Sequence, residues 1–249
     1  MFSSKTTALL VVVCSQETCA FEQANRRQLV CGLGSVLLQQ QTAVAYSSEA
    51  YDRYASNYDA LDGGPLARAL GIEGMREKYV SPLRGDILEI CAGTGLNSQF
   101  FASDARVTYA DMSRGMLEVA KKRRGAASVV LADARQLPFE KASFDAVLET
   151  FCLCVLEEPE RTLTEVARVL RPGGTFVLID NTRPDQPLLK TFLDATGPLL
   201  DQTDLSKQCR PFDVLRLLQT DNFTALFDIL QADTFGAGFF TALKLRRRS

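Results

Sequence analysis

The 249-residue sequence contains no histidine and no tryptophan. The absence of histidine excludes Ser-His-Asp and Cys-His catalytic sites, histidine-ligated metal centres and the commonest general base of enzymes. A basic excess is also missing, because 28 Lys and Arg residues face 30 Asp and Glu residues, for a net charge of −2. Proteins held on nucleic acid by phosphate contacts need clustered positive charge. We therefore expect chemistry without imidazole and no nucleic-acid partner.

No apolar run reaches the roughly 20 residues of a membrane-spanning helix. Instead, residues 1–45 contain two short apolar segments, at 8–14 and 29–38. The second follows Arg26 and Arg27 and ends in a small-residue triplet at 43–45, a pattern typical of twin-arginine export signals. Two targeting segments in series resemble the leaders of plastid proteins bound for the thylakoid lumen. We expect residues 1–45 to be a targeting leader that is removed and the protein to reside in a plastid, with the mitochondrion as the alternative.

Cysteine usage gives little sign of a metal site. Four of the seven cysteines, Cys91, Cys152, Cys154 and Cys209, lie outside the predicted leader, and none of them forms a CxxC pair. Without histidine, zinc would need four thiolates from scattered positions. We therefore predict no metal site and expect these cysteines to be buried free thiols.

Residues 46–249 are predicted to form one domain that begins with a helical cap at 46–82. Within the cap, Tyr51, Tyr54, Ala55 and Tyr58 recur at helical spacing, and helical spacing resumes from 66 to 80. Asp62-Gly63-Gly64-Pro65 separates the two stretches. The cap is thus expected to consist of two helices.

Strands and helices alternate in the predicted core, residues 83–182. The expected strands are 86–91, 106–110, 128–131, 144–149 and 175–180, and the expected helices are 96–103, 113–124 and 159–170. Such alternation of buried strands with helices indicates an α/β fold with a Rossmann-like, doubly wound, mostly parallel sheet.

The last part, residues 183–249, is predicted to supply acceptor-side helices and a terminal hairpin. Helices are expected at 187–201 and 212–219, and β-rich runs at 223–231 and 238–245 would add an antiparallel hairpin to the sheet. Arg246, Arg247 and Arg248 read as a solvated end, with peripheral contact to an anionic membrane as the alternative.

Polar and small residues follow four of the predicted strands. Ligands of open parallel sheets bind at the carboxyl ends of the strands, where the strand order reverses. Glycines at 93 and 95 would let the backbone approach a ligand, and the Asp111 carboxylate could accept hydrogen bonds from ribose hydroxyls. Asp133 with Ala134 closes the third strand, and Thr150 follows the fourth. The ordered set indicates a nucleoside-type cofactor at this edge.

Five segments in order resemble the motifs of class I S-adenosyl-L-methionine-dependent methyltransferases of the type 11 or UbiE-like branch. They are 87–95 (ILEICAGTG), 110–113 (ADMS), 131–134 (LADA), 143–147 (SFDAV) and 170–174 (LRPGG). Residues 51–59 resemble the helix that precedes the core in that branch and closes over the cofactor. The resemblance spans residues 50–182 and implies S-adenosylmethionine as the cofactor and methyl transfer as the activity.

The resemblance also implies cofactor contacts for nine residues: Glu89, Gly93, Thr94, Gly95, Asp111, Met112, Asp133, Ala134 and Thr150. The glycine loop and Glu89 would serve the methionine part, with Thr150 near the sulfonium. Asp111 would hold the ribose, and the remaining three would contact adenine. Cys91 departs from the pattern, because it stands where the family usually has its first glycine.

The acceptor is implied only broadly, as a small or lipid-like molecule such as a quinone precursor or a thiol, and catalytic residues are not assigned. An alcohol acceptor would need a base, with Tyr54, Tyr58 and Glu149 as candidates, whereas a sulfur, nitrogen or activated carbon acceptor needs little help. Two alternatives are a non-catalytic cofactor-binding or assembly protein and a nicotinamide-dependent oxidoreductase. The latter is disfavoured because Ser98 stands where a third glycine would seat a pyrophosphate.

Overall fold

The computed structural model describes residues 48–56, 58–59, 64–123, 126–156, 158–182 and 214–249. All described residues belong to one compact unit, Ala43–Ser249. The predicted leader, the predicted helix at 187–201 and Cys209 lie outside the described residues.

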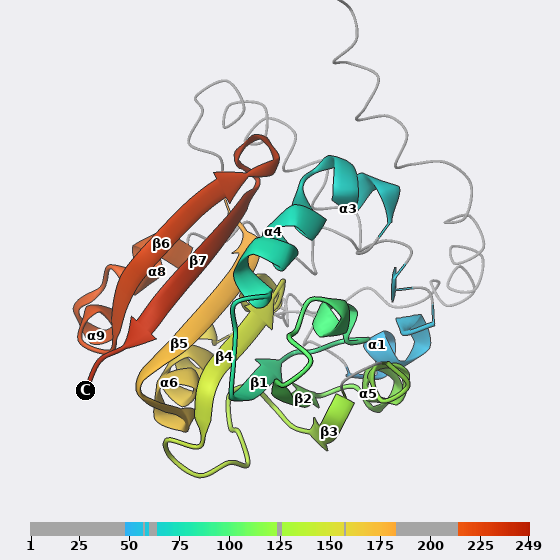
Figure 1. The fold of residues 1–249 in the computed structure, drawn as a ribbon, viewed down its shortest axis with the longest axis horizontal. Helices are drawn as coiled ribbons and strands as arrows, with labels where there is room; N and C mark the ends of the chain where they lie inside the picture. The colour runs from blue at the N-terminus through green and yellow to red at the C-terminus, as the bar shows by residue number, and fades with distance from the viewer. Residues whose placement is uncertain (1–47, 57, 60–63, 124–125, 157, 183–213) are drawn as a thin grey trace, which may run out of the picture. The chain divides into compact units, whose positions relative to one another are not determined.

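A seven-stranded sheet of order β3-β2-β1-β4-β5-β7-β6 forms the centre of this unit (Figure 1). The parallel strands are β1 (Asp86–Ile90), β2 (Arg106–Asp111), β3 (Ala126–Leu131), β4 (Phe144–Thr150) and β5 (Leu170–Asn181). The antiparallel strands are β6 (Phe227–Phe235) and β7 (Phe240–Arg247). The predicted Rossmann-like sheet with a terminal antiparallel hairpin is confirmed.

The helices are shorter than the sequence pattern predicts. The α-helices are α1 (Ser48–Tyr54), α3 (Pro65–Ala69), α4 (Ile72–Val80), α5 (Arg114–Ala120), α6 (Pro159–Val169), α8 (Val214–Leu218) and α9 (Asp221–Thr224), and the 3-10 turns are η2 (Leu96–Gln99), η3 (Leu153–Val155) and η4 (Gly236–Gly238). The predicted helix at 66–80 is broken because Gly71 is left-handed, with φ of 83°. The predicted helix at 96–103 is only the four-residue turn η2.

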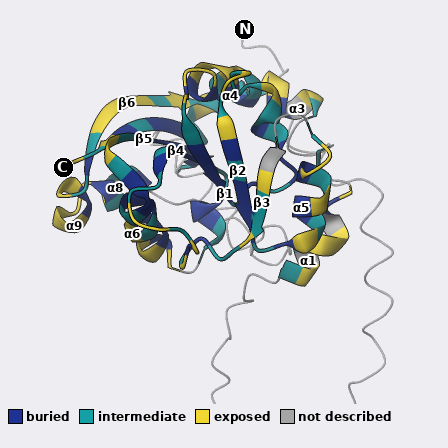
Figure 2. Ribbon diagram, turned by 60° about the horizontal axis from the view of Figure 1, so that its bottom comes forward, coloured by how far each residue is buried: buried dark blue, intermediate teal, exposed yellow. Residues whose placement is uncertain are grey.

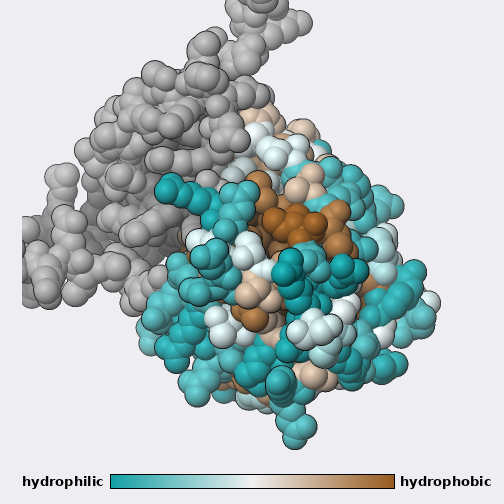
Figure 3. Space-filling view, turned by 90° about the vertical axis from the view of Figure 1, so that its left-hand side faces the viewer, coloured by the Kyte–Doolittle hydropathy of each residue, from teal (hydrophilic) through white to brown (hydrophobic). Residues whose placement is uncertain are grey.

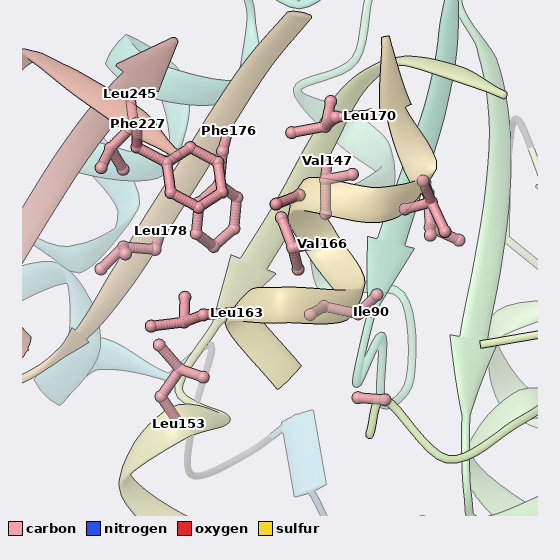
Figure 4. Packing of buried hydrophobic residues seen from close by; sticks show 14 of the residues in the cluster. Ile90, Val147, Leu153, Leu163, Val166, Leu170, Phe176, Leu178, Phe227 and Leu245 are labelled. Atoms are coloured by element: carbon pink, nitrogen blue, oxygen red, sulfur yellow. The ribbon is translucent and has the colours of Figure 1, made fainter. Parts of the chain in front are cut away.

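Two hydrophobic cores cover the two faces of the sheet. Because side chains alternate along a strand, Val147 packs into the core beneath α6 while Leu148 packs into the core beneath α4. Figure 4 shows the first core, where Leu163 and Val166 of α6 lie against the sheet. The central strands are buried and the outer helix surfaces are exposed (Figure 2). Burial on both faces explains the nearly continuous apolar strands of the sequence.

The β6 edge exposes two large apolar side chains. Ile229 and Leu230 are 42% and 50% exposed, and Figure 3, which faces this side, shows hydrophobic surface among hydrophilic neighbours. Nearby, Asp228 forms ion pairs with Arg246 and Arg248, and Arg247 donates to the Leu170 carbonyl. The predicted solvated arginine end is thus partly bound to the sheet. None of the described helices is long and apolar enough to cross a membrane.

Candidate functional site

Three polar side chains meet where β1 and β4 end, the point at which the strand order reverses. Glu89 of β1 and Asn97 of η2 are each only 1% exposed. The Asn97 side-chain amide donates to Glu89 Oε1 at 2.8 Å and to Thr150 Oγ1 at 3.1 Å. We call these three residues the strand-end triad. Their position is the crevice in which open parallel sheets bind ligands.

The strand-end triad has hydrogen-bonding capacity to spare. Glu89 Oε2 and Asn97 Oδ1 are buried and have no hydrogen-bond partner among the residues that the structure describes. Burial raises the pKa of Glu89 to about 8, while the Asn97 hydrogen bond and the Arg76 charge oppose that rise. Buried polar atoms are nearly always satisfied. Two unsatisfied acceptors therefore fit a ligand that brings donors, such as the ammonium group of an amino acid.

Arg76 of α4 adds a buried cation to this region. Its side chain is 3% exposed, and its guanidinium carbon lies 5.7 Å from the centre of the Phe151 ring. The sequence analysis assigned no role to Arg76. Its charge favours the ionised form of Glu89, so it tunes the carboxyl on which cation binding would depend.

The glycine loop between β1 and η2 approaches its neighbours closely. Gly93 and Gly95 have φ of 55° and 74°, a region that favours glycine. A Cβ added at Gly95 would lie 3.2 Å from Ala120 Cβ, and one added at Gly93 would lie 3.9 Å from the Tyr58 ring. The loop is thus a narrow cradle between the cap and α5.

Asp111 fastens this loop to the end of β2. Its Oδ2 accepts the Gly93 N–H and its Oδ1 accepts the Ser113 N–H, both at 2.8 Å. Burial raises the pKa of Asp111, and these backbone bonds oppose the rise. Each oxygen retains a lone pair for a ribose hydroxyl. Met112, beside it, is partly exposed, as an adenine contact would require.

Asp133 and Ala134 lie beyond β3 as predicted, but Asp133 is already paired. Arg135 Nη2 donates to Asp133 Oδ2 at 2.8 Å, and this hydrogen bond lowers the pKa of Asp133. Ala134 is 5% exposed and belongs to the core beneath α6. Contact of Asp133 with an adenine amine remains a prediction.

Two aspartates tie the cap to the cofactor edge. Asp52 of α1 accepts the Ser113 hydroxyl at 2.6 Å and the Gly115 N–H at 2.7 Å. The Thr94 hydroxyl donates to Asp59 at 2.5 Å, and Arg123 joins Asp59 to the Thr94 carbonyl. The N-terminal cap is therefore hydrogen-bonded to the glycine loop and to the start of α5.

The expectation of free thiols is wrong for two cysteines. Cys91 and Cys152 form a disulfide with a Cα–Cα distance of 6.0 Å, because β1 and β4 are neighbours, Cys91 directly follows β1 and Cys152 lies two residues after the end of β4. Cys154 is buried and not part of a disulfide, and the Asn181 side-chain amide donates to its Sγ at 3.3 Å. No group of three or more metal-binding side chains occurs among the residues that the structure describes.

Glu149, a candidate base in the sequence analysis, serves the backbone. Its Oε1 accepts the N–H groups of Cys152 and Leu153 at 2.5 and 3.2 Å. The neighbouring Asp180 accepts the N–H groups of Cys154 and Asn181. Both carboxyls are fully buried, and burial raises the pKa of each. This pair anchors the turn after β4.

Sequence reasoning missed four residues at the site: Arg76, Asn97, Asp52 and Asp59. The only available signal was an asparagine just inside a predicted helix, where its side chain competes with the backbone. The others act through contacts between segments far apart in the chain.

Comparison with known proteins shows which family has sequences similar to this chain. Residues 88–178 match the model of the family described as "Methyltransferase domain". Demethylmenaquinone methyltransferase from Clavibacter sepedonicus is 43% identical over 132 residues, covering 49% of this chain and 54% of that protein. The same enzyme from Symbiobacterium thermophilum is 33% identical over 192 residues, covering 68% and 76%. Phosphatidylethanolamine N-methyltransferase from Cereibacter sphaeroides is 33% identical, covering 58% and 70%.

Solved structures agree on the fold. The N-methyltransferase NodS from Bradyrhizobium japonicum, in complex with S-adenosylhomocysteine, has a TM-score of 0.59 at 18% identity, covering 81% of this chain and 98% of that one. The [4+2]-cyclase SpnF has a TM-score of 0.61 at 18% identity, covering 81% and 94%. The fold is that of class I S-adenosylmethionine-dependent methyltransferases. The chain belongs to the methyltransferase family that includes the demethylmenaquinone and UbiE enzymes.

Proposed function

We propose that this chain transfers a methyl group from S-adenosylmethionine to a small, quinone-like or lipid-like acceptor. The observation that carries the proposal is the strand-end triad, in a chain whose Symbiobacterium relative shares 33% identity over 76% of its length. The chain spans only 54% of the length of the Clavibacter relative. The proposed acceptor is therefore argued from the chemistry of the site and not from the names of the relatives.

The residues present fit the cofactor. Glu89 Oε2 and Asn97 Oδ1 would accept from its amino acid part, and Asp111 would accept from its ribose. The cofactor supplies an electrophilic methyl group, so the protein mainly holds the reactants in line and excludes water. Phe151 beside Thr150 presents an aromatic wall at the end of β4.

The acceptor atom is proposed to be an activated carbon, a sulfur or a nitrogen. The sequence has no histidine, and Glu149 is committed to backbone N–H groups. For an unactivated alcohol this leaves Tyr58, whose ring lies near Gly93, as the described candidate base, and a phenol is a weak base at neutral pH. A ring carbon flanked by hydroxyls, as in a demethylated quinol, needs less assistance.

The full chain should be assayed with methyl-labelled S-adenosylmethionine and three acceptors: a demethylated naphthoquinol in vesicles, phosphatidylethanolamine vesicles and a small aromatic thiol. We expect label in the quinol. Label in the phospholipid or the thiol alone would replace the acceptor but keep methyl transfer. Failure to bind S-adenosylhomocysteine would overturn the proposal and favour a protein without this cofactor, whereas binding without transfer would favour the non-catalytic alternative.

We also propose that residues 1–45 direct the protein to a plastid. The support is the twin-arginine pattern and the two apolar segments in series. A fluorescent protein fused after residue 45 should accumulate in plastids, and replacing Arg26 and Arg27 by lysine should alter its final compartment. Accumulation in mitochondria would contradict the plastid assignment.

A further inference from the structure

The Cys91–Cys152 disulfide joins the two segments on which the proposed cofactor site depends. Cys91 directly follows β1 and precedes Gly93 by two residues, while Cys152 lies two residues after Thr150. Gly93 and Thr150, both predicted to lie along the methionine end of the cofactor, are thus each two residues along the chain from a cysteine of the disulfide. No other described cysteine pair is joined.

The linked segments hold unusual backbone conformations. Cys91 and Phe151 have φ of 48° and 58°, a left-handed region that costs energy for residues other than glycine. Such conformations persist only where surrounding contacts enforce them. On the side of β4, Glu149 and Asp180 hold the turn through three backbone N–H groups, those of Cys152, Leu153 and Cys154. On the side of β1, the cross-link and the Gly93–Asp111 bond restrain Cys91.

The geometry points to Cys91 and Cys152 as positioning residues whose oxidation state sets the affinity of the cofactor site. In the disulfide form the glycine loop and the Thr150–Phe151 segment are held ready for the ligand. In the dithiol form the loop can leave its left-handed conformation, and cofactor binding must restore the order. Preorganisation of this kind raises affinity by lowering the cost of ordering. This inference rests on the proposed function.

The redox step balances with a dithiol reductant. Cys91 is partly exposed and Cys152 is 2% exposed, so a dithiol thiolate attacks Cys91 Sγ and releases the Cys152 thiolate, which takes a proton. The second thiol of the reductant then displaces Cys91 and closes its own disulfide. Two electrons and two protons pass from the reductant to the protein.

The test is calorimetric titration of the full chain with S-adenosylhomocysteine, in the oxidised form and after dithiothreitol. Alkylation and mass measurement should show that Cys91 and Cys152 gain two alkyl groups on reduction. We expect about tenfold weaker binding after reduction and recovery on reoxidation. Cys91→Ser and Cys152→Ser should bind weakly in both conditions, and Cys154→Ser should keep the redox response.

Cys91→Gly separates the cross-link from the backbone. Glycine adopts positive φ without steric cost, so this variant should bind more tightly than Cys91→Ser and ignore dithiothreitol. Equal affinities of oxidised and reduced wild type, with only the unfolding temperature changed, would show a purely structural disulfide and overturn the inference. A redox response that persists in Cys91→Ser would do the same. If neither form binds, the proposed function fails as well.

Discussion

Glu89 and Glu149 occupy matching places at the ends of neighbouring strands, yet their surroundings differ. Both are fully buried, and burial raises the pKa of each. Glu89 faces the α4 side of the sheet and meets a side-chain amide, with one oxygen unsatisfied. Glu149 faces the α6 side and accepts two N–H groups of the turn after β4 through Oε1, while its Oε2, like Glu89 Oε2, has no hydrogen-bond partner among the described residues.

The comparison shows that two buried glutamates near the ends of neighbouring strands can have different roles. Glu149 accepts backbone donors and interacts with the Asp180 carboxyl, so it stabilises a local conformation. Glu89 is joined to Asn97, which also has an unsatisfied oxygen, where the strand order reverses, so this pair has capacity for a ligand that brings donors.

Glu149→Ala should lower the free energy of unfolding by about 3 kcal/mol, because it leaves the buried N–H groups of Cys152 and Leu153 without an acceptor. Glu149→Gln keeps an acceptor oxygen and should cost less than about 1 kcal/mol. Urea unfolding of both variants measures the difference. Equal losses would mean that charge, rather than backbone bonding, is what Glu149 provides.

Glu89→Gln should weaken S-adenosylhomocysteine binding by roughly 10- to 100-fold, because it removes a charge-assisted bond to the ligand amine. The folded protein should survive, since Gln can still accept the Asn97 amide. Glu149→Gln is the matched control and should change the dissociation constant by less than about threefold. If Glu89→Gln and Glu149→Gln weakened binding equally, the assignment of ligand binding to Glu89 rather than Glu149 would be wrong.

Proton release on binding sharpens the same point. The ligand-free Glu89 has a pKa of about 8, so at pH 6 to 7 it is protonated, and a cationic ligand would favour its ionised form. Affinity should therefore rise with pH towards 8, by at most tenfold per unit for one proton. Calorimetry in buffers of different ionisation enthalpy would measure the released proton. The release should vanish in Glu89→Gln.

The pH dependence of folding stability has the opposite sign to the pH dependence of ligand affinity. The pKa of Glu89 is raised by folding from 4.5 to about 8, so its contribution to stability is full at low pH and is lost as the pH rises towards 8. The stability of Glu89→Gln relative to wild type should therefore improve across this range. A flat difference between the two would contradict the raised pKa.

The class of the sheet, its terminal hairpin and the positions of the strand ends were predictable from the sequence, because buried parallel strands are apolar and the motifs recur at fixed intervals. Helix lengths were not, since Gly71 and the Asn97 side chain interrupt helical spacing locally. The disulfide was missed because 61 residues separate its cysteines in the sequence. The roles of Glu89 and Glu149 depend on which partners tertiary contacts supply, and spacing alone does not carry that information.

The smallest predicted effect comes from a comparison of two glycines, Gly115 of α5 and Gly74 of α4. It tests whether α1 covers the cofactor site. A Cβ on Gly115 would lie 2.9 Å from Asp52 Cα and Asp52 O, whereas a Cβ on Gly74 of α4 would meet nothing within 4 Å. Gly115→Ala should therefore push α1 outward and break the Asp52 bonds, at about 1 kcal/mol. Gly74→Ala should stabilise α4 by roughly 0.5–1 kcal/mol. Hydrogen exchange of the α1 amides should quicken only in Gly115→Ala, together with a faster release of S-adenosylhomocysteine. Unchanged exchange and unchanged ligand release would mean that α1 does not close over the cofactor. The sheet and α4 would then cover the cofactor site without α1.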